Sequence, residues 1–512
     1  MKSLNLINGN IITLDENNPN CSSLYIENGE IHSFNNIVKK AHTIDLHGAT
    51  VIPGFIDAHF HLKNLGKRLN QLNLKGKTSI HDILSDVKSQ LKNISPNEWI
   101  LGFGWDQNLW DDKLFPHSHF LNDISPDNPI YFTRIDGHAA WVNDCALKKI
   151  GRSLENLNTI NGGKVINNCI LIDNSMGPFK NFLPKENKAQ VKKWILSAIN
   201  HVSKMGITGV HDAWQDRVTI ESILELIQEK KFPIRCYGML ASNDSKLLDE
   251  YFKKGHYTSD FYSIRSVKAF IDGALGSRGA ALHEPYSDEH NNCGLILISK
   301  EDFSGLTQLC YKNNFQLNTH AIGDRGNEYV LNHYANILNG KNNKRWRIEH
   351  AQMVTDLDVT RFKEFDILPS MQPSHCTSDM KWLPEKIGES RLSLISRWQT
   401  FINNGLKIPG GSDCPIEAGN PLFEFYAAVT RKDHSGWPQK GFQPQEKINR
   451  VNALKMFTTW AAYGGFDESK RGKIKIGFDA DLTILDNDIL SVSSNDILNT
   501  KILYTIVNGE II

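Results

Sequence analysis

The sequence predicts an α/β fold: a (β/α)8 TIM barrel with a small β-sandwich domain built from both termini and an insertion after barrel strand 1. Three observations lead to this prediction. Strand-like and helix-like segments alternate from about residue 187, both ends of the chain consist of short strands with tight turns, and the stretch after residue 62 breaks the alternation. The length of 512 residues is compatible with one large unit, because α/β barrels commonly exceed an average domain.

The two ends of the chain are expected to form one domain together. Residues 11–14 and 23–26 have the composition of strands, and the same style returns in residues 477–485. Neither end is long enough for a good hydrophobic core alone. Residues 1–50 and 472–512 are therefore predicted to pack as a composite β-sandwich.

The barrel is predicted over residues 51–62 and 187–471. Its first strand is the apolar segment that leads into His59, and seven later strands are expected over residues 207–212, 234–240, 262–272, 315–320, 346–350, 368–372 and 406–413. Apolar residues at helical spacing predict helices over residues 191–205, 220–228, 302–314, 327–338, 359–365, 394–402 and 453–462. Ser299 and Asp302 resemble a capping box at the start of one helix. Right-handed crossovers would close eight such strands into a barrel.

Residues 63–186 do not follow the strand–helix repeat. They contain a predicted helix over residues 80–91 and predicted strands over residues 99–103 and 129–133. We interpret this stretch as an insertion after the first barrel strand. Loops on that side of a barrel lie over the active-site face, so the insertion is expected to form a lid or a wall for the substrate.

The overall composition is that of an ordinary soluble globular protein, with 40% hydrophobic and 22% charged residues. Lys+Arg and Asp+Glu both number 57, so the net charge is zero and favours neither nucleic acid nor a membrane surface as a partner. We find no signal-peptide pattern and no segment apolar for long enough to span a bilayer. The eight cysteines form no CxxC pair, which fits a reducing cytoplasm. A homodimer is expected only from base rates.

Several predicted strands end in a side chain that could bind a metal. His59 and His61 are two residues apart, so on a strand they point to the same side, and imidazole suits zinc and its first-row neighbours. Other strands end at or near Lys268, His320, His350 and Asp413. Each alone has a structural alternative, such as a hydrogen-bonded histidine, a solvated lysine or a helix N-cap aspartate. Active sites of these barrels lie at the C-terminal ends of the strands, so together the side chains are expected to meet in one axial pocket.

Seven motifs carry a resemblance to a known family. They are PGFIDAHFH at residues 53–61, VKAFIDGALGSR at 267–278, THAIGDR at 319–325, RIEHAQ at 347–352, MQPS at 371–374, GSD at 411–413 and GKIxxGxDADL at 472–482. With these motifs the chain resembles the amidohydrolase superfamily, specifically the amidohydrolase family 3 branch that includes N-substituted formamide deformylases. The resemblance covers nearly the whole length of the chain.

The resemblance implies one or two divalent metal ions at the barrel mouth, with zinc as the expected metal. The metal ligands would be His59, His61, Lys268, His320, His350 and Asp413. Lys268 would be carboxylated by CO2, because an ammonium group cannot bind a cation whereas a carbamate offers two anionic oxygens. The two histidines of the first strand would hold the more buried ion, and His320 and His350 would hold the second.

The function expected from this resemblance is hydrolysis of a non-peptide C–N bond in a small-molecule amide, N-substituted formamide or cyclic amide. A bound cation lowers the pKa of coordinated water and so supplies hydroxide at neutral pH. Asp413 would act as the general base and pass the proton to the leaving nitrogen. The alternatives are ester hydrolysis or isomerisation at the same site, or a catalytically silent scaffold or regulatory protein.

Three further residues are candidates for substrate contact: Trp105, His138 and Arg278. Their alternatives are aromatic packing for Trp105, a structural role for His138, and a salt bridge that holds a loop for Arg278. His211 and Asp212 end the second barrel strand and are expected to support the metal ligands from behind.

Overall fold

The computed structural model describes residues 3–135, 137–184 and 186–512. The chain divides into two compact units. The barrel unit comprises Met1–Leu62 and Ile199–Ile512, and the insertion unit comprises Lys63–Ala198. Among the described helices, none combines the length and the apolar character that a membrane crossing requires.

A parallel sheet forms seven sides of the barrel. Its strands, in spatial order, are β8 (Phe55–Phe60), β15 (Ile207–Gln215), β16 (Arg235–Ala241), β18 (Tyr262–Phe270), β19 (Gln316–Ala321), β20 (Arg347–His350) and β21 (Leu368–Ser370). Each strand pairs in parallel with its neighbours in this order. The spatial order follows the sequence order, as the predicted strand–helix repeat requires.

The eighth side of the barrel is an irregular segment at residues 406–414. It is bridged on both sides in parallel, by Met371 to Gly410 and by Phe60 to Cys414. Pro409 has no N–H for a strand ladder, so a regular eighth strand does not form. The N–H of Ala58 nevertheless donates to the Gly410 carbonyl at 2.9 Å. The predicted closed barrel is thus confirmed, although its last strand is not the regular strand that we expected over residues 406–413.

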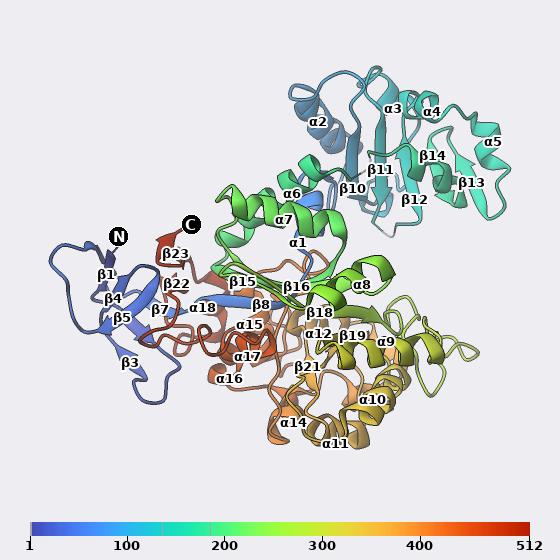
Figure 1. Cartoon of the computed structure of the whole chain (residues 1–512). Helices are drawn as coiled ribbons and strands as arrows, with labels where there is room; N and C mark the ends of the chain where they lie inside the picture. Colours follow the sequence, from blue (N-terminus) through green and yellow to red (C-terminus); the bar gives the residue numbers. More distant parts are fainter. Residues whose placement is uncertain (1–2, 136, 185) are drawn as a thin grey trace. The chain divides into compact units, whose positions relative to one another are not determined.

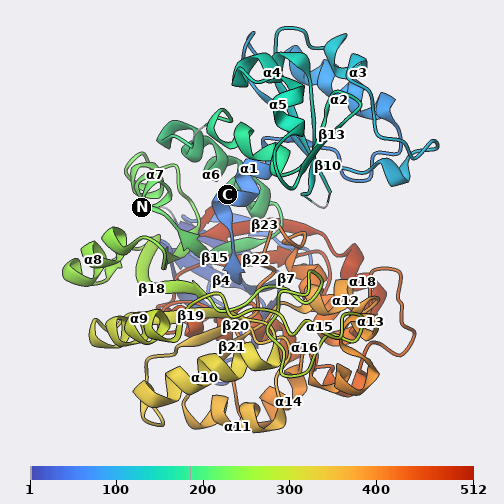
Figure 2. The same cartoon turned by 90° about the vertical axis from the view of Figure 1, so that its right-hand side faces the viewer.

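Helices cover the outside of the barrel strands. The helices α7 (Arg217–Gln228), α8 (Ser245–Lys254), α9 (Lys300–Lys312), α10 (Asp324–Leu338) and α11 (Asp356–Glu364) follow successive strands. Figure 2 shows α8 to α11 one after another along the outer side of β18 to β21. The Ser299 hydroxyl accepts a hydrogen bond from the Asp302 N–H at 3.1 Å, which confirms the predicted cap of α9.

The remaining helices of the barrel unit lie mostly in the last third of the chain. They are α12 (Pro373–Asp379), α13 (Leu383–Ile387), α14 (Trp398–Asn403), α15 (Pro421–Thr430), α16 (Arg450–Met456), α17 (Thr459–Gly464) and α18 (Ser494–Asn499). The sequence did not predict α8, α12, α13, α15 or α18. The helix α12 has only seven residues, too few for a clear apolar period.

Both ends of the chain form the predicted β-sandwich. One sheet has the order β5 (Glu30–Phe34), β4 (Leu24–Glu27), β1 (Ser3–Ile7), β6 (His42–Asp45). The other has the order β24 (Glu510–Ile511), β23 (Ile502–Val507), β22 (Leu482–Leu485), β7 (Thr50–Pro53), β2 (Asn10–Ile12), β3 (Asn20–Cys21). The antiparallel pair of β7 and β22 joins the two ends of the chain in one sheet, seen in Figure 1 where blue and red strands meet.

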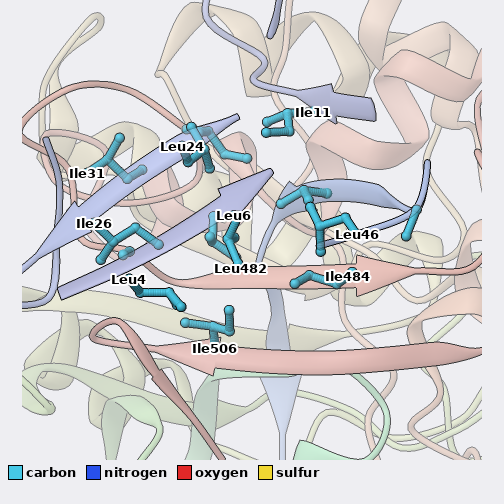
Figure 3. Packing of buried hydrophobic residues seen from close by; sticks show 14 residues of the cluster. Leu4, Leu6, Ile11, Leu24, Ile26, Ile31, Leu46, Leu482, Ile484 and Ile506 are labelled. Atoms are coloured by element: carbon cyan, nitrogen blue, oxygen red, sulfur yellow. The ribbon is translucent and has the colours of Figure 1, made fainter. Parts of the chain in front are cut away.

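The core of the sandwich lies between its two sheets. Figure 3 shows Leu6 and Ile26 from the four-stranded sheet facing Leu482 and Ile484 from the six-stranded sheet. All four side chains are almost fully buried. Because the two halves of this core come from opposite ends of the sequence, neither end can bury its apolar side chains without the other.

The insertion unit is built on a mixed six-stranded sheet. Its order is β13 (Gly163–Ile166), β14 (Ile170–Asp173), β12 (Ala139–Val142), β11 (Ile130–Arg134), β10 (Ile100–Trp105), β9 (Leu72–Asn73). The helices α2 (Ile80–Leu91), α4 (Asp144–Ile150) and α5 (Leu154–Asn158) accompany the sheet, and the unit ends within α6 (Lys188–Ser203). Two hydrophobic clusters fill this unit. It therefore has a core of its own, and its role as a lid stays a prediction.

Candidate metal centre

The six predicted ligand side chains lie at the carboxyl ends of the barrel strands. His59 lies on β8, Lys268 on β18, His320 on β19 and His350 on β20. His61 directly follows β8, and Asp413 lies in the eighth segment. Neighbouring members of the set are in contact around the barrel axis. Lys268 Nζ lies 3.3 Å from His59 Nε2, and the rings of His320 and His350 are 4.5 Å apart between centroids. The structure thus brings all six side chains to one place.

Asp413 is the carboxylate at the middle of this group. Its Oδ1 lies 3.0 Å from His61 Nε2 and 3.4 Å from His59 Nε2. One possible ligand atom from each of His59, His350 and Asp413 lies within 4.8 Å of the other two. Two imidazoles and a carboxylate at this spacing can all reach one cation.

In three of the histidines, Nδ1 contacts an oxygen atom of another residue. His59 Nδ1 lies 2.6 Å from Glu349 Oε2, His61 Nδ1 lies 2.9 Å from the Ala213 carbonyl, and His350 Nδ1 lies 2.8 Å from Gln372 Oε1. An oxygen acceptor at Nδ1 favours the tautomer that carries its proton there. Each Nε2 then presents a lone pair to the centre, as metal binding requires. The sequence reasoning did not identify Glu349 and Gln372, although both lie inside quoted motifs.

Burial and nearby charges set the protonation of the ligands. Burial, together with the charge of Lys268, lowers the pKa of His320 to about 3, and burial beside His320 lowers the pKa of His350 well below its usual range. Burial lowers the pKa of Lys268 to about 8. Burial alone would raise the pKa of Asp413, but His59 and His61 outweigh it and hold the carboxyl well below its ordinary value. At neutral pH His320 and His350 are therefore neutral imidazoles and Asp413 is an anionic carboxylate.

The donor set fits a zinc-like cation. Within the described residues, the buried Nε2 of His320 has no hydrogen-bond partner. An unsatisfied buried polar atom costs about 1–3 kcal/mol, and coordination of a cation would remove this cost. Neutral imidazoles with a carboxylate are common zinc ligands. The histidines and the carboxylate at this place are therefore compatible with a metal.

Two buried aspartates hold the segments that carry the ligands. Asp57 accepts a hydrogen bond from the Ser412 hydroxyl at 2.6 Å and from the His59 N–H at 3.1 Å, which ties β8 to the eighth segment. Asp272 accepts three backbone N–H bonds, two of them from the loop after His320. Burial raises the pKa of both carboxyls to about 7. The sequence reasoning gave neither residue a role.

The predicted supporting pair, His211 and Asp212, lies within β15 beside the first strand. His211 Nδ1 accepts from the buried guanidinium of Arg347 at 3.0 Å. Asp212 Oδ1 accepts from the Leu62 N–H at 2.7 Å and so fixes the chain directly after His61. Both residues act on the ligands through the backbone and through neighbouring side chains.

The predicted substrate-contact residues have other partners in the structure. Trp105 is fully buried in the core of the insertion unit, and its indole N–H donates to the Phe132 carbonyl at 2.8 Å. His138 Nδ1 lies 2.8 Å from Asp173 Oδ1 on the surface of the same unit. Arg278 forms a bidentate ion pair with Asp288 at 2.7 and 3.1 Å. These contacts are those of the structural alternatives, and substrate contact stays a prediction for all three residues.

One further histidine beside the centre was missed. His375 lies on the short helix α12, and its Nε2 is 3.8 Å from Asp413 Oδ2. The quoted MQPS motif ends one residue before it. Because the sequence reasoning treated only strand ends as candidate positions, a residue on an unpredicted helix was not considered.

Comparison with known proteins identifies the family of the chain. Residues 42–512 match the amidohydrolase family. Protein LONG AFTER FAR-RED 3 of Arabidopsis thaliana is 31% identical over 536 residues, which cover 98% of this chain and 90% of that protein. The N-substituted formamide deformylase of Arthrobacter pascens is 22% identical over 540 residues, with 99% and 98% of the two chains covered.

A solved structure agrees with the fold over almost the whole chain. The crystal structure of an uncharacterized metal-dependent hydrolase from Pyrococcus horikoshii OT3 matches with a TM-score of 0.82 and 26% identity. The match covers 96% of this chain and 99% of that one. The resemblance inferred from the motifs is therefore confirmed at the level of the family.

Proposed function

Because the chain belongs to the amidohydrolase family, we propose that it is a metal-dependent hydrolase that cleaves a non-peptide C–N bond in a small-molecule amide, N-substituted formamide or cyclic amide. The observation that carries this proposal is the meeting of two paired histidines, a lysine, two further histidines and Asp413 at one mouth of the barrel. The similarity to a formamide deformylase favours the formamide class among these substrates.

In this proposal the six side chains would hold one or two zinc ions. A bound zinc ion supplies two effects: it lowers the pKa of water and it polarises the carbonyl of the substrate. His59, His61 and His350 are already aligned by their Nδ1 partners, so binding costs little rearrangement. Asp413, anionic and beside both histidines of the first strand, would accept the proton of the attacking water and deliver it to the leaving nitrogen.

Lys268 is suited to the proposed carbamate. Only a neutral amine reacts with CO2, and an exposed lysine is almost entirely protonated at pH 7. Because burial lowers the pKa of Lys268 to about 8, more of its side chains are neutral at that pH than in an exposed lysine. Its Nζ lies within reach of His59 Nε2, where a carbamate oxygen could share a cation with the imidazole.

Metal analysis and an amide screen of the purified protein test the proposed function. We expect about one or two zinc ions per chain and hydrolysis of at least one N-formyl, N-acyl or cyclic amide. The Asp413→Asn variant should lose at least about 100-fold in kcat, because the amide cannot accept the proton. A silent scaffold would instead bind little metal, hydrolyse none of these amides, and behave identically with and without the substitution.

A further inference from the structure

His375 is a half-buried imidazole beside the centre that the proposed ligand set leaves unused. Its side chain is 16% exposed, and its Nε2 lies 3.8 Å from Asp413 Oδ2. Within the described residues, this nitrogen has no hydrogen-bond partner. Buried polar atoms are nearly always paired in folded proteins, so an unpaired one at an active site requires an explanation.

The carboxylate of Asp413 separates His375 from the paired histidines of the first strand. Asp413 Oδ1 faces His59 and His61, whereas Oδ2 faces His375. The ring of His375 also stacks on that of His350, with the centroids 5.8 Å apart and an angle of 12° between the planes. His375 therefore borders the space between two proposed ligands without belonging to the pair that holds Oδ1.

The helix that carries His375 is fixed at both ends. The Ser374 N–H donates to buried Glu424 Oε2 at 2.8 Å, next to the first turn of α12. Gln352 Nε2 donates to Asp379 Oδ2 at 2.8 Å, at the last residue of α12. A side chain on so short a helix would otherwise be poorly placed. These two anchors hold the imidazole in a defined position, as preorganised catalytic groups require.

The distance between His375 and Asp413 defines what the pair can bind. At 3.8 Å the two atoms are too far apart for a direct hydrogen bond. A substrate oxygen can nevertheless lie about 2.8–3.0 Å from Nε2 while the attacking water lies beside Asp413. The negative charge of Asp413 favours the tautomer of His375 that carries its proton on Nε2. The imidazole then offers an N–H donor at the place where the carboxylate handles a proton.

We propose that His375 is a catalytic residue, which donates a hydrogen bond from Nε2–H to the carbonyl oxygen of the bound amide and to the oxyanion that this oxygen becomes. The inference rests on the proposed amide hydrolysis. The water oxygen bonds to the carbonyl carbon, the π electron pair moves to the carbonyl oxygen, and the water proton passes to Asp413. The C–N bond then breaks as the carbonyl re-forms, and the leaving nitrogen takes the proton from Asp413. His375 keeps its own proton throughout.

Two substitutions of His375 separate this role from a structural one. His375→Gln retains an N–H donor of similar reach, whereas His375→Phe retains a ring of similar shape without a donor. The matched control is His32→Phe, an exposed histidine on β5 of the sandwich. Each protein is assayed for bound zinc, for the Kd of acetohydroxamate by calorimetry, and for kcat and KM with the amide found in the screen. Acetohydroxamate presents a carbonyl oxygen to a zinc site and needs no turnover.

We expect zinc content to be equal in all four proteins. His375→Phe should weaken acetohydroxamate binding by roughly tenfold, the effect of one lost hydrogen bond. It should lower kcat by about 100–1,000-fold, with a smaller change in KM, as for other donors to an oxyanion. His375→Gln should recover most of both losses, and His32→Phe should match the native protein.

Other outcomes would overturn the inference. Native acetohydroxamate affinity and native kcat in His375→Phe would show that the imidazole touches no reacting atom. Loss of zinc in both His375 variants would show that it holds the fold or the metal instead. If the native protein itself binds neither zinc nor acetohydroxamate, the proposed function fails and this inference fails with it, a result distinct from a failure confined to the His375 variants.

Discussion

At the scale of single residues, the candidate metal centre depends on the neighbouring residues that orient each proposed ligand. His59 is oriented by Glu349, a fully buried carboxylate at 2.6 Å. Burial alone would raise the pKa of Glu349, but His59 and Lys268 outweigh it and lower the pKa to about 2. The carboxylate is therefore charged and fixes the proton of His59 on Nδ1. Partners of this kind make the imidazole a better metal ligand.

We predict that Glu349→Gln lowers zinc affinity by about 10–100-fold. The amide keeps the size of the side chain but removes the charge that orients and polarises His59. Competition with a chromophoric zinc chelator measures this affinity. The matched control is Glu364→Gln, at an exposed position of α11. Unchanged affinity in Glu349→Gln would contradict the role assigned to this contact.

Two of the proposed metal ligands have a strained backbone. His350 and Asp413 have φ values of 73° and 58°, a region that residues other than glycine rarely adopt. Such strain costs on the order of 1–3 kcal/mol per residue and persists where the surroundings enforce it. The two positions lie on different sides of the barrel and both turn a side chain toward the axis. Two of the proposed metal ligands are thus among the residues that adopt this conformation.

At the scale of elements, the irregular eighth segment lets Asp413 approach the first strand. The N–H of Asp413 donates to the His59 carbonyl at 2.8 Å, and the Asp57 carboxylate bonds to Ser412. This approach requires glycine at position 411, because a Cβ there would lie 2.4 Å from the His59 nitrogen. The same glycine lies beside the Asp57 carboxylate, which a Cβ at position 411 would approach to 2.8 Å.

Gly411→Ala should therefore destabilise the barrel unit by about 1–3 kcal/mol and reduce bound zinc, because the contacted atom belongs to the backbone of β8 and cannot rotate away. Chemical denaturation and metal analysis provide the two measurements. Gly305→Ala on α9 is the control, since a Cβ there meets no atom within 4 Å. In a helix, that substitution should stabilise by about 0.5–1 kcal/mol. Equal behaviour of the two variants would refute the steric argument.

At the scale of the whole molecule, two separate sets of cores hold the chain together. The sandwich core of the barrel unit draws on both termini, and the insertion unit has two clusters of its own. The sandwich can form only after the last strands of the barrel unit are available. The insertion unit, in contrast, is continuous in sequence and buries its own apolar side chains.

Ile484→Ala should cost the barrel unit about 2–5 kcal/mol, the usual range for removing a fully buried isoleucine side chain. Ile484 is fully buried between the two sheets of the sandwich. Leu503→Ala on β23 is the control, because this side chain is 44% exposed and should change stability by less than about 0.5 kcal/mol. Differential scanning calorimetry should show a transition of the insertion unit that Ile484→Ala leaves in place. A shift of every transition by the same amount would contradict separate cores.

Local pattern was sufficient for much of the fold. Apolar runs indicated β15, β16, β18, β19 and β20, because these strands are buried on both faces. Apolar periodicity indicated the helices α7, α9, α10 and α11, because each buries one face against the barrel. The sandwich could be predicted because neither terminal stretch of strands is long enough to form a hydrophobic core alone. Prediction failed where periodicity is absent: α12 is too short to show it, and Pro409 and the glycines after it interrupt the eighth strand.

The sequence by itself determined which side chains could bind a metal. His59-x-His61 and the residues at the ends of later strands can be identified from the sequence alone. Only the tertiary structure decided what positions them. Glu349 meets His59 across 290 residues of chain, and His375 reaches Asp413 from a helix with no signature of its own. The physical reason is that a ligand type is a property of one residue. Its orientation and protonation depend on groups that only folding brings within a few ångströms.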